Sequence, residues 1–283
     1  MDILYIIEKY LNEYHINPDF FQLYSSSTEN INSYMQYFDL NNKSLLTTGS
    51  SSDQAINATL AKCNDITVCD ICPLTKYYYY LKLASLLVLN RKEFLDFICI
   101  KKTDIEENRY FLLKSTFNKI KSTLKHLDYE SYYVWEYLFK KYSTNDIKRL
   151  FREDVNDMES IIYCNRYLKN DYNYNHVKET VINASINFIN EDMSNLNISR
   201  SFDNIWLSNI PQHLNNQENE KLINNSIRLL NDKGKILLCY FWNTSMTVKG
   251  FPIEYFKNIK AKKQKIMGIS KNDDRNSILL YTR

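Results

Sequence analysis

The chain has 283 residues, enough for one large domain or two small ones. Hydrophobic residues make up 44% of it and charged residues 24%, proportions that are ordinary for a soluble globular protein. A net charge of +3 is too small to indicate a nucleic acid or an anionic membrane as the partner.

Targeting signals and disulfides are not expected. The first 14 residues carry Asp2 and Glu8 without a basic head, so we expect no signal peptide. No apolar run reaches the ~18 residues of a membrane-spanning helix. The six cysteines show no rhythm of a disulfide scaffold. These features predict a cytoplasmic protein, and the sequence does not reveal its oligomeric state.

The N-terminal 38 residues are expected to form a helical cap. Apolar spacing predicts helices at residues 2–14 and about 28–37, with Asn17-Pro18 breaking the first. Residues 24–28 either form part of a lid or pack simply against the sheet. Residues 39–283 are expected to form an α/β, Rossmann-like domain.

The stretch from residue 44 to residue 70 predicts a strand, a turn, a helix and a second strand. The strands are expected at 44–48 and 66–69, and Asp53 is placed to cap a helix at about 54–62. Gly49 and Asp70 lie 21 positions apart, near the roughly 20 expected between a glycine turn and a ribose-binding acid. The alternatives are an ordinary tight turn and an exposed acid at a strand end.

The chemistry of the turn favours one nucleoside cofactor. A pyrophosphate favours three glycines at a helix start, whereas this turn has only Gly49, followed by three serines. The Asp53 carboxylate would repel a phosphate and suits an amino group or a sulfonium. The residues therefore favour S-adenosylmethionine over NAD or FAD, although Asp53 as a simple helix cap is an open alternative.

The same residues resemble a known family. The pattern L-x-x-x-G-S-x-x-D…V-x-D-x-x-P…K-L-A is similar to S-adenosylmethionine-dependent transferases of the class I methyltransferase fold. Within them it looks most like the branch with the 3-amino-3-carboxypropyl transferase of betaine-lipid synthesis. Serines replace two glycines of that branch, Cys72 replaces an asparagine, and Thr75 stands where that branch has a glutamine. The resemblance implies a seven-stranded sheet with the last strand antiparallel. The cofactor-binding positions that the resemblance implies here are Gly49, Ser50, Ser51, Asp53, Asp70 and Ile71.

A glycine-free and proline-free segment separates the second and third predicted strands. Residues 95–170 are read as a helical insertion, with helices at about 108–127, 129–141 and 144–153. We interpret it as a cap that shapes an acceptor pocket, and a purely structural annex is the alternative. Its tyrosines and isoleucines favour a small or amphipathic acceptor over DNA or RNA.

Strand–helix alternation then resumes. We expect a helix at 174–182, strands at 186–189 and from 202, a helix at 218–230 that stops at 232–234, and strands at 235–241, 265–269 and 277–282.

Further candidate site residues follow the third and fourth strands. In the resembling family the position of Asp192 binds the adenine amino group, with Glu191 as a neighbouring alternative. Ser208 and Asn209 follow the fourth strand, where the resembling family holds residues that orient the acceptor, and Ser208 is also assigned to the cofactor site. His213 is the best-placed general base, because an imidazole has a pKa of ~6.5, and a surface residue at a helix start is the alternative.

No metal site is expected. Cys69 and Cys72 form a C-x-x-C, but Cys69 lies within a strand and no second ligand pair stands nearby. A lysine-rich run at 257–265 is read as a solvated connection rather than a phosphate site.

Three functions remain open from the sequence. The first is a methyltransferase that uses S-adenosylmethionine and a small-molecule acceptor, where catalysis is chiefly the positioning of an in-line attack. The second is transfer of the 3-amino-3-carboxypropyl group from the same cofactor. The third is a binding module that keeps the fold without catalysis.

Overall fold

The computed structural model describes residues 2–12, 21–49, 51–100, 111–152, 158–240, 262–265 and 277–283. The chain forms two compact units. The first comprises residues 1–27, 49–53 and 71–161, and the second comprises residues 28–48, 54–70 and 162–283. The predicted division at residue 38 stays a prediction.

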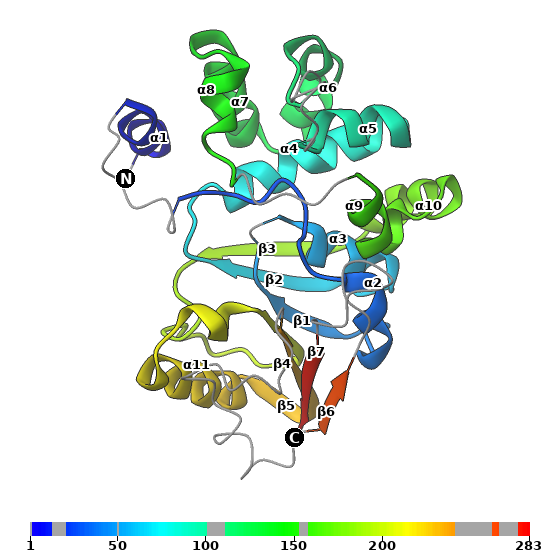
Figure 1. The fold of residues 1–283 in the computed structure, drawn as a ribbon, viewed down its shortest axis with the longest axis vertical. Helices are drawn as coiled ribbons and strands as arrows, with labels where there is room; N and C mark the ends of the chain where they lie inside the picture. Colours follow the sequence, from blue (N-terminus) through cyan, green and yellow to red (C-terminus); the bar gives the residue numbers. More distant parts are fainter. Residues whose placement is uncertain are drawn as a thin grey trace. The chain divides into compact units, whose positions relative to one another are not determined.

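The second unit contains a seven-stranded sheet within the described residues (Figure 1). The strand order is β3-β2-β1-β4-β5-β7-β6, and β7 runs antiparallel to both of its neighbours. The strands are β1 (Ser44–Thr47), β2 (Asp65–Asp70), β3 (Ser185–Asn190), β4 (Phe202–Ser208), β5 (Leu230–Tyr240), β6 (Lys262–Lys265) and β7 (Ser277–Thr282). This order confirms the predicted α/β, Rossmann-like class I methyltransferase sheet, including its antiparallel last strand.

The strand order reverses between β1 and β4. β1 pairs in parallel with β2 on one side and with β4 on the other, so the order reverses there. In open α/β sheets, ligands bind at the carboxyl ends of the strands beside such a switch point. The strands that meet there are apolar and buried, with Leu45, Leu46 and Ile205 each at 0% exposure.

Helices complete the second unit. They are α2 (Ile31–Tyr34), η2 (Met35–Tyr37), η3 (Arg166–Leu168), α10 (Asp171–Val181), η4 (Ile210–His213) and α11 (Asn216–Arg228). α11 begins with a capping box in which Asn215 and Glu218 satisfy each other's backbone N–H groups. Apolar side chains of α11 and β4 share one buried cluster with β5, which includes Leu222, Ile223 and Ile236.

Two elements have residues in both units. α3 (Asp53–Leu60) has its first residue in the first unit, and α9 (Met158–Cys164) changes unit after Ile161.

The first unit is helical within its described residues. Its helices are α1 (Ile3–Asn12), α4 (Thr75–Val88), α5 (Arg91–Ile98), α6 (Lys114–Leu127), α7 (Tyr129–Lys141) and α8 (Thr144–Lys148). The Trp135 indole of α7 is buried and donates to the Tyr77 carbonyl of α4 at 2.8 Å. Leu23 exchanges backbone hydrogen bonds with Leu150 and Arg152, which ties the N-terminal segment to the end of α8.

Most predicted elements are confirmed, with shifts at their ends. α7 has the predicted bounds, whereas α8 ends at Lys148 instead of 153. The predicted stop at 232–234 is wrong, because β5 already begins at Leu230 and runs through these residues with an irregular register against β4. The predicted strand at 265–269 is found at Lys262–Lys265, and residues 266–269 lie outside the described part of the chain.

Candidate functional site

The predicted ribose-binding acid stands at the carboxyl edge of the sheet. Asp70 is the last residue of β2 and is half-buried, and its carbonyl accepts from Asn190 Nδ2 at 2.9 Å and from the Glu191 N–H at 3.1 Å. These bonds hold the end of β2 against the end of β3. The backbone of Asp70 is therefore fixed at the edge where a ligand of such a sheet binds.

The Asp192 carboxylate is engaged within its own turn. One oxygen accepts from the Ser194 N–H at 2.8 Å and the other from Asn195 Nδ2 at 3.3 Å. Side-chain acceptance from the backbone two residues on is a common way for Asp to stabilise a turn. The adenine contact of Asp192 stays a prediction, beside the turn-stabilising contacts that the structure gives it.

A buried carboxyl group lies behind the end of β4. Glu29 is 2% exposed, and its oxygens accept hydrogen bonds from the hydroxyls of Tyr34 and Ser208. The backbone N–H of Asn209 also donates to it. Burial raises the pKa of the Glu29 carboxyl from 4.5 to about 7, against the opposing effect of its hydrogen bonds.

Three predicted site residues lie next to this carboxyl group, and their exposure increases from Ser208 to His213. Ser208 is buried, Asn209 is half-buried and His213 is exposed. Ser208 Oγ lies 3.3 Å from Asn209 Oδ1, and Asn209 Nδ2 lies 3.2 Å from His213 Nε2. Three predicted residues are thus brought together, and Glu29 joins them as a fourth. Sequence reasoning missed Glu29, because an acid just before a short helix is typical of an ordinary helix start.

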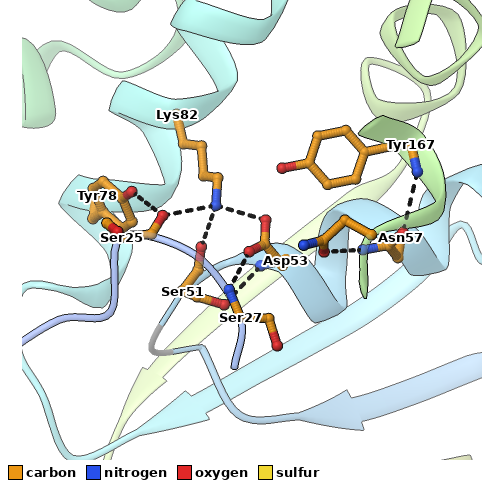
Figure 2. Close-up of polar contacts among 9 residues, drawn as sticks. Ser25, Ser27, Ser51, Asp53, Asn57, Tyr78, Lys82 and Tyr167 are labelled. Atoms are coloured by element: carbon orange, nitrogen blue, oxygen red, sulfur yellow. Dashed lines mark hydrogen bonds and ion pairs between the residues drawn. The ribbon is translucent and has the colours of Figure 1, made fainter. Parts of the chain in front are cut away.

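The predicted glycine turn belongs to the first unit, where a buried lysine meets it (Figure 2). Lys82 and Asp53 are both at 0% exposure, and Lys82 Nζ lies 2.6 Å from Asp53 Oδ1. Lys82 Nζ also donates to the carbonyls of Ser51 at 2.8 Å and Ser25 at 3.2 Å. Asp53 Oδ2 accepts from the Ser27 N–H at 2.6 Å.

This network gives Asp53 a partner that the sequence did not predict. The amino group expected from a cofactor is matched, in the structure, by the Lys82 ammonium of the chain itself. A signal was present in the sequence, because a lysine within the apolar run L-K-L-A of a buried helix needs a counter-charge. The contact of Asp53 with a cofactor stays a prediction.

Two buried hydroxyl groups near this turn have no hydrogen-bond partner within the part of the chain that the structure describes. Ser52 has a left-handed φ of 67° and is buried, as is Ser25. Among the described residues, neither Ser52 Oγ nor Ser25 Oγ has a hydrogen-bond partner. Buried polar atoms are normally satisfied, so these hydroxyls fit the polar groups of a bound molecule. Ser50 lies outside the described residues. Gly49, Ser51 and the 43% exposed Ile71 keep their predicted roles as predictions.

A separate amide pair in the second unit is structural. Asn57 Nδ2 donates to Asn165 Oδ1 at 3.0 Å, and Asn57 Oδ1 accepts from the Tyr167 N–H at 3.4 Å (Figure 2). All three residues are buried, and the pair joins α3 to η3.

The six cysteines are buried free thiols in this structure, and none of them forms a disulfide. Burial raises the pKa of the Cys69 thiol to about 12, which disfavours the reactive thiolate. Within the described ranges, no cluster of three or more His, Cys, Asp or Glu side chains is arranged to hold a metal ion. The helices in those ranges also include none that is long and apolar enough to cross a bilayer.

Comparison with known proteins gives likeness of structure only. No protein-family model matches the chain, and no curated protein matches it. The glycopeptide N-methyltransferase MtfA, complexed with S-adenosylhomocysteine, is similar at 8% identity over 92% of this chain and 91% of MtfA, with a TM-score of 0.47. The N-methyltransferase NodS of Bradyrhizobium japonicum is similar at 10% identity over 85% of this chain and 76% of NodS, with a TM-score of 0.41.

An rRNA methyltransferase is among the similar structures as well. AviRa of Streptomyces viridochromogenes is similar at 9% identity over 86% of this chain and 77% of its own, with a TM-score of 0.41. The absence of a nucleic-acid partner and the cytoplasmic location stay predictions.

Proposed function

We propose that this protein is an S-adenosylmethionine-dependent transferase that moves a methyl group to a small-molecule acceptor. The observation that carries the proposal is the sheet order, with its reversal between β1 and β4 and its antiparallel β7. That order is the one of the class I methyltransferase fold that the sequence motifs resemble. Fold alone does not define function, so the side chains at the carboxyl edge must support the same conclusion.

Side chains at that edge fit the cofactor. The carboxylate of Asp70, at the end of β2, is suited to accept from both hydroxyls of a ribose. Such charge-assisted hydrogen bonds contribute about 1.5–3 kcal/mol each. At the end of β4, the second strand of the switch point, Ser208 and Asn209 present polar groups that suit an acceptor.

The chemistry demands little from the protein. When bound, S-adenosylmethionine supplies a methyl group already activated by its sulfonium. The residues of the chain then hold the two partners in line, and proximity of this kind supplies most of the rate enhancement. Asp70 would bind the cofactor ribose. Asn209 would orient the acceptor, and His213 remains the predicted proton acceptor.

Replacing Asp70 by alanine is expected to weaken S-adenosylmethionine binding about ten-fold or more. A ten-fold loss corresponds to ~1.4 kcal/mol, at the lower end of what one charge-assisted hydrogen bond provides. Isothermal titration calorimetry of the cofactor into wild type and Asp70→Ala measures it. Asp232→Ala is the matched control, because Asp232 is an exposed acid near the amino end of β5, where the described residues show a surface ion pair with Arg283.

The outcomes separate the three functions. Absence of binding to wild type at millimolar cofactor would reject the transferase and leave a scaffold with this fold. If wild type binds, the released nucleoside identifies the reaction. S-adenosylhomocysteine indicates methyl transfer, and methylthioadenosine indicates transfer of the 3-amino-3-carboxypropyl group, the reaction of the branch that the motifs resemble.

A further inference from the structure

Glu29 holds the end of β4 at two consecutive residues. Its carboxyl accepts from the Ser208 hydroxyl and from the Asn209 backbone N–H. Ser208 has a φ of 54°, in the left-handed region that residues other than glycine rarely adopt. Backbone in such a conformation persists where surrounding contacts maintain it, and it is concentrated at functional sites. Here the carboxyl group of Glu29 supplies those contacts.

The contacts of Glu29 with Ser208 and Asn209 lie at the switch point of the sheet. Thr47 of β1 pairs in register with Trp206 of β4, so Ser208 lies just past the last paired residues of the switch point. Glu29 itself comes from the segment before α2, 179 residues away in the sequence. A buried acid is thus held at the strand ends where ligands of such sheets bind.

We propose that Glu29 is a positioning residue of the acceptor site, which orients Ser208 and Asn209 so that their oxygen atoms accept hydrogen bonds from a substrate carrying an N–H group. This inference rests on the proposed transferase function and names its substrate class as an amine.

The group that receives the Ser208 hydroxyl proton determines which substrate class can bind. A hydroxyl has a single proton and two acceptor sites. The Ser208 hydroxyl is within hydrogen-bond distance of Glu29 and, at 3.3 Å, of Asn209 Oδ1, and its one proton goes to Glu29 when that carboxyl is ionised. The Ser208 oxygen and Asn209 Oδ1 are then both left as acceptors. An amine can donate to these oxygens, and it keeps the lone pair that attacks a methyl group. A carboxylate or phosphate ligand would place its own acceptor oxygens against these two acceptors, with the Glu29 carboxyl group behind them, while the donor Nδ2 of Asn209 lies 3.2 Å from His213 Nε2.

The groups around Glu29 keep its carboxyl as a hydrogen-bond acceptor. The Tyr34 hydroxyl of α2 donates to its other oxygen, and burial raises the pKa of Tyr34, so this phenol remains protonated. Cys239 of β5 and Cys164 of α9 lie near Tyr34, and His213 lies beyond Asn209. With a pKa of about 7, Glu29 is ionised on the alkaline side of neutrality, and only then must Ser208 donate to it. Amine binding is therefore expected to strengthen as the pH rises through about 7.

The test follows the Asn209 backbone amide by NMR, because this N–H donates directly to Glu29. Benzylamine and benzoate, which share one carbon skeleton, are titrated at saturating S-adenosylmethionine and pH 8. We expect benzylamine to shift the Asn209 resonance with at least ten-fold higher affinity than benzoate. Glu29→Gln is expected to weaken benzylamine binding about ten-fold and to remove its pH dependence.

Tyr34→Phe is the control, because it removes a donor to the same carboxyl on the side away from Ser208. If Glu29 only stabilised the fold, both variants would affect the amine equally or not at all. An unchanged affinity in Glu29→Gln, equal binding of benzoate, or no shift with benzylamine would overturn the inference. Calorimetry of S-adenosylmethionine on the same samples separates this from failure of the proposed function, since the cofactor can bind normally in each of these cases.

Discussion

Replacing Lys82 by methionine is expected to lower the free energy of unfolding by about 3–5 kcal/mol. The substitution keeps the length of the side chain and removes the ammonium that lies 2.6 Å from Asp53. Both side chains are at 0% exposure, so water cannot replace the lost charge. The Asp53 carboxylate would then remain buried with the Ser27 N–H as a neutral donor, and the carbonyls of Ser25 and Ser51 would lose their shared donor.

Urea denaturation followed by circular dichroism measures this loss. Lys119→Met is the matched control, because Lys119 and Glu93 form an exposed ion pair at 2.9 Å, and such pairs contribute under about 1 kcal/mol. The double variant Lys82→Met with Asp53→Asn removes both charges and is expected to recover much of the stability. A loss in Lys82→Met no larger than in Lys119→Met would show that the buried pair is not important to the first unit.

The second large effect is a pH dependence of stability that disappears in Glu29→Gln. The folded-state pKa of Glu29 is about 7, against 4.5 for an exposed carboxyl. Between these values the folded protein binds more protons than the unfolded chain, so the contribution of Glu29 is complete below pH 4.5. It is lost as the pH rises to about 7 and is constant above. A shift of this size corresponds to about 3 kcal/mol.

The measurement compares two proteins at several pH values. The free energy of unfolding of wild type minus that of Glu29→Gln is expected to fall by about 3 kcal/mol between pH 4.5 and pH 8. Other titrating groups cancel in this difference, because both proteins share them. Glu220→Gln is the control, since Glu220 is exposed on α11 and its substitution should show no such trend. A difference that stays constant with pH would contradict the raised pKa of Glu29.

Local patterns in the sequence were sufficient for the strands and helices that build the sheet. Apolar runs at 44–48 and 66–69 predicted β1 and β2 within two residues, and the Gly49–Asp70 spacing placed an acid at the end of β2. These features depend on neighbours in the chain, where periodicity and turn chemistry act. The start of β5 was missed because Asp232, Lys233 and Gly234 are typical turn residues. Leu230 nevertheless pairs with Phe202, and Lys235 pairs with Asn204 and Thr282, so the strand continues on both sides of these turn residues across a shift in register.

The side-chain partners were decided by the tertiary structure alone. Glu29 meets Ser208 across 179 residues, and Lys82 meets Asp53 across 29. From the sequence, Glu29 had the pattern of an ordinary helix-start acid and Asp53 that of a cap or cofactor ligand. Burial changes both, because a carboxyl group removed from water must find donors, gain a counter-charge or take up a proton. Asp53 gains the charge of Lys82, whereas Glu29 gains neutral donors and a raised pKa. The sequence by itself therefore determined the elements and their order along the chain. Only the tertiary structure decided which polar groups are buried against one another.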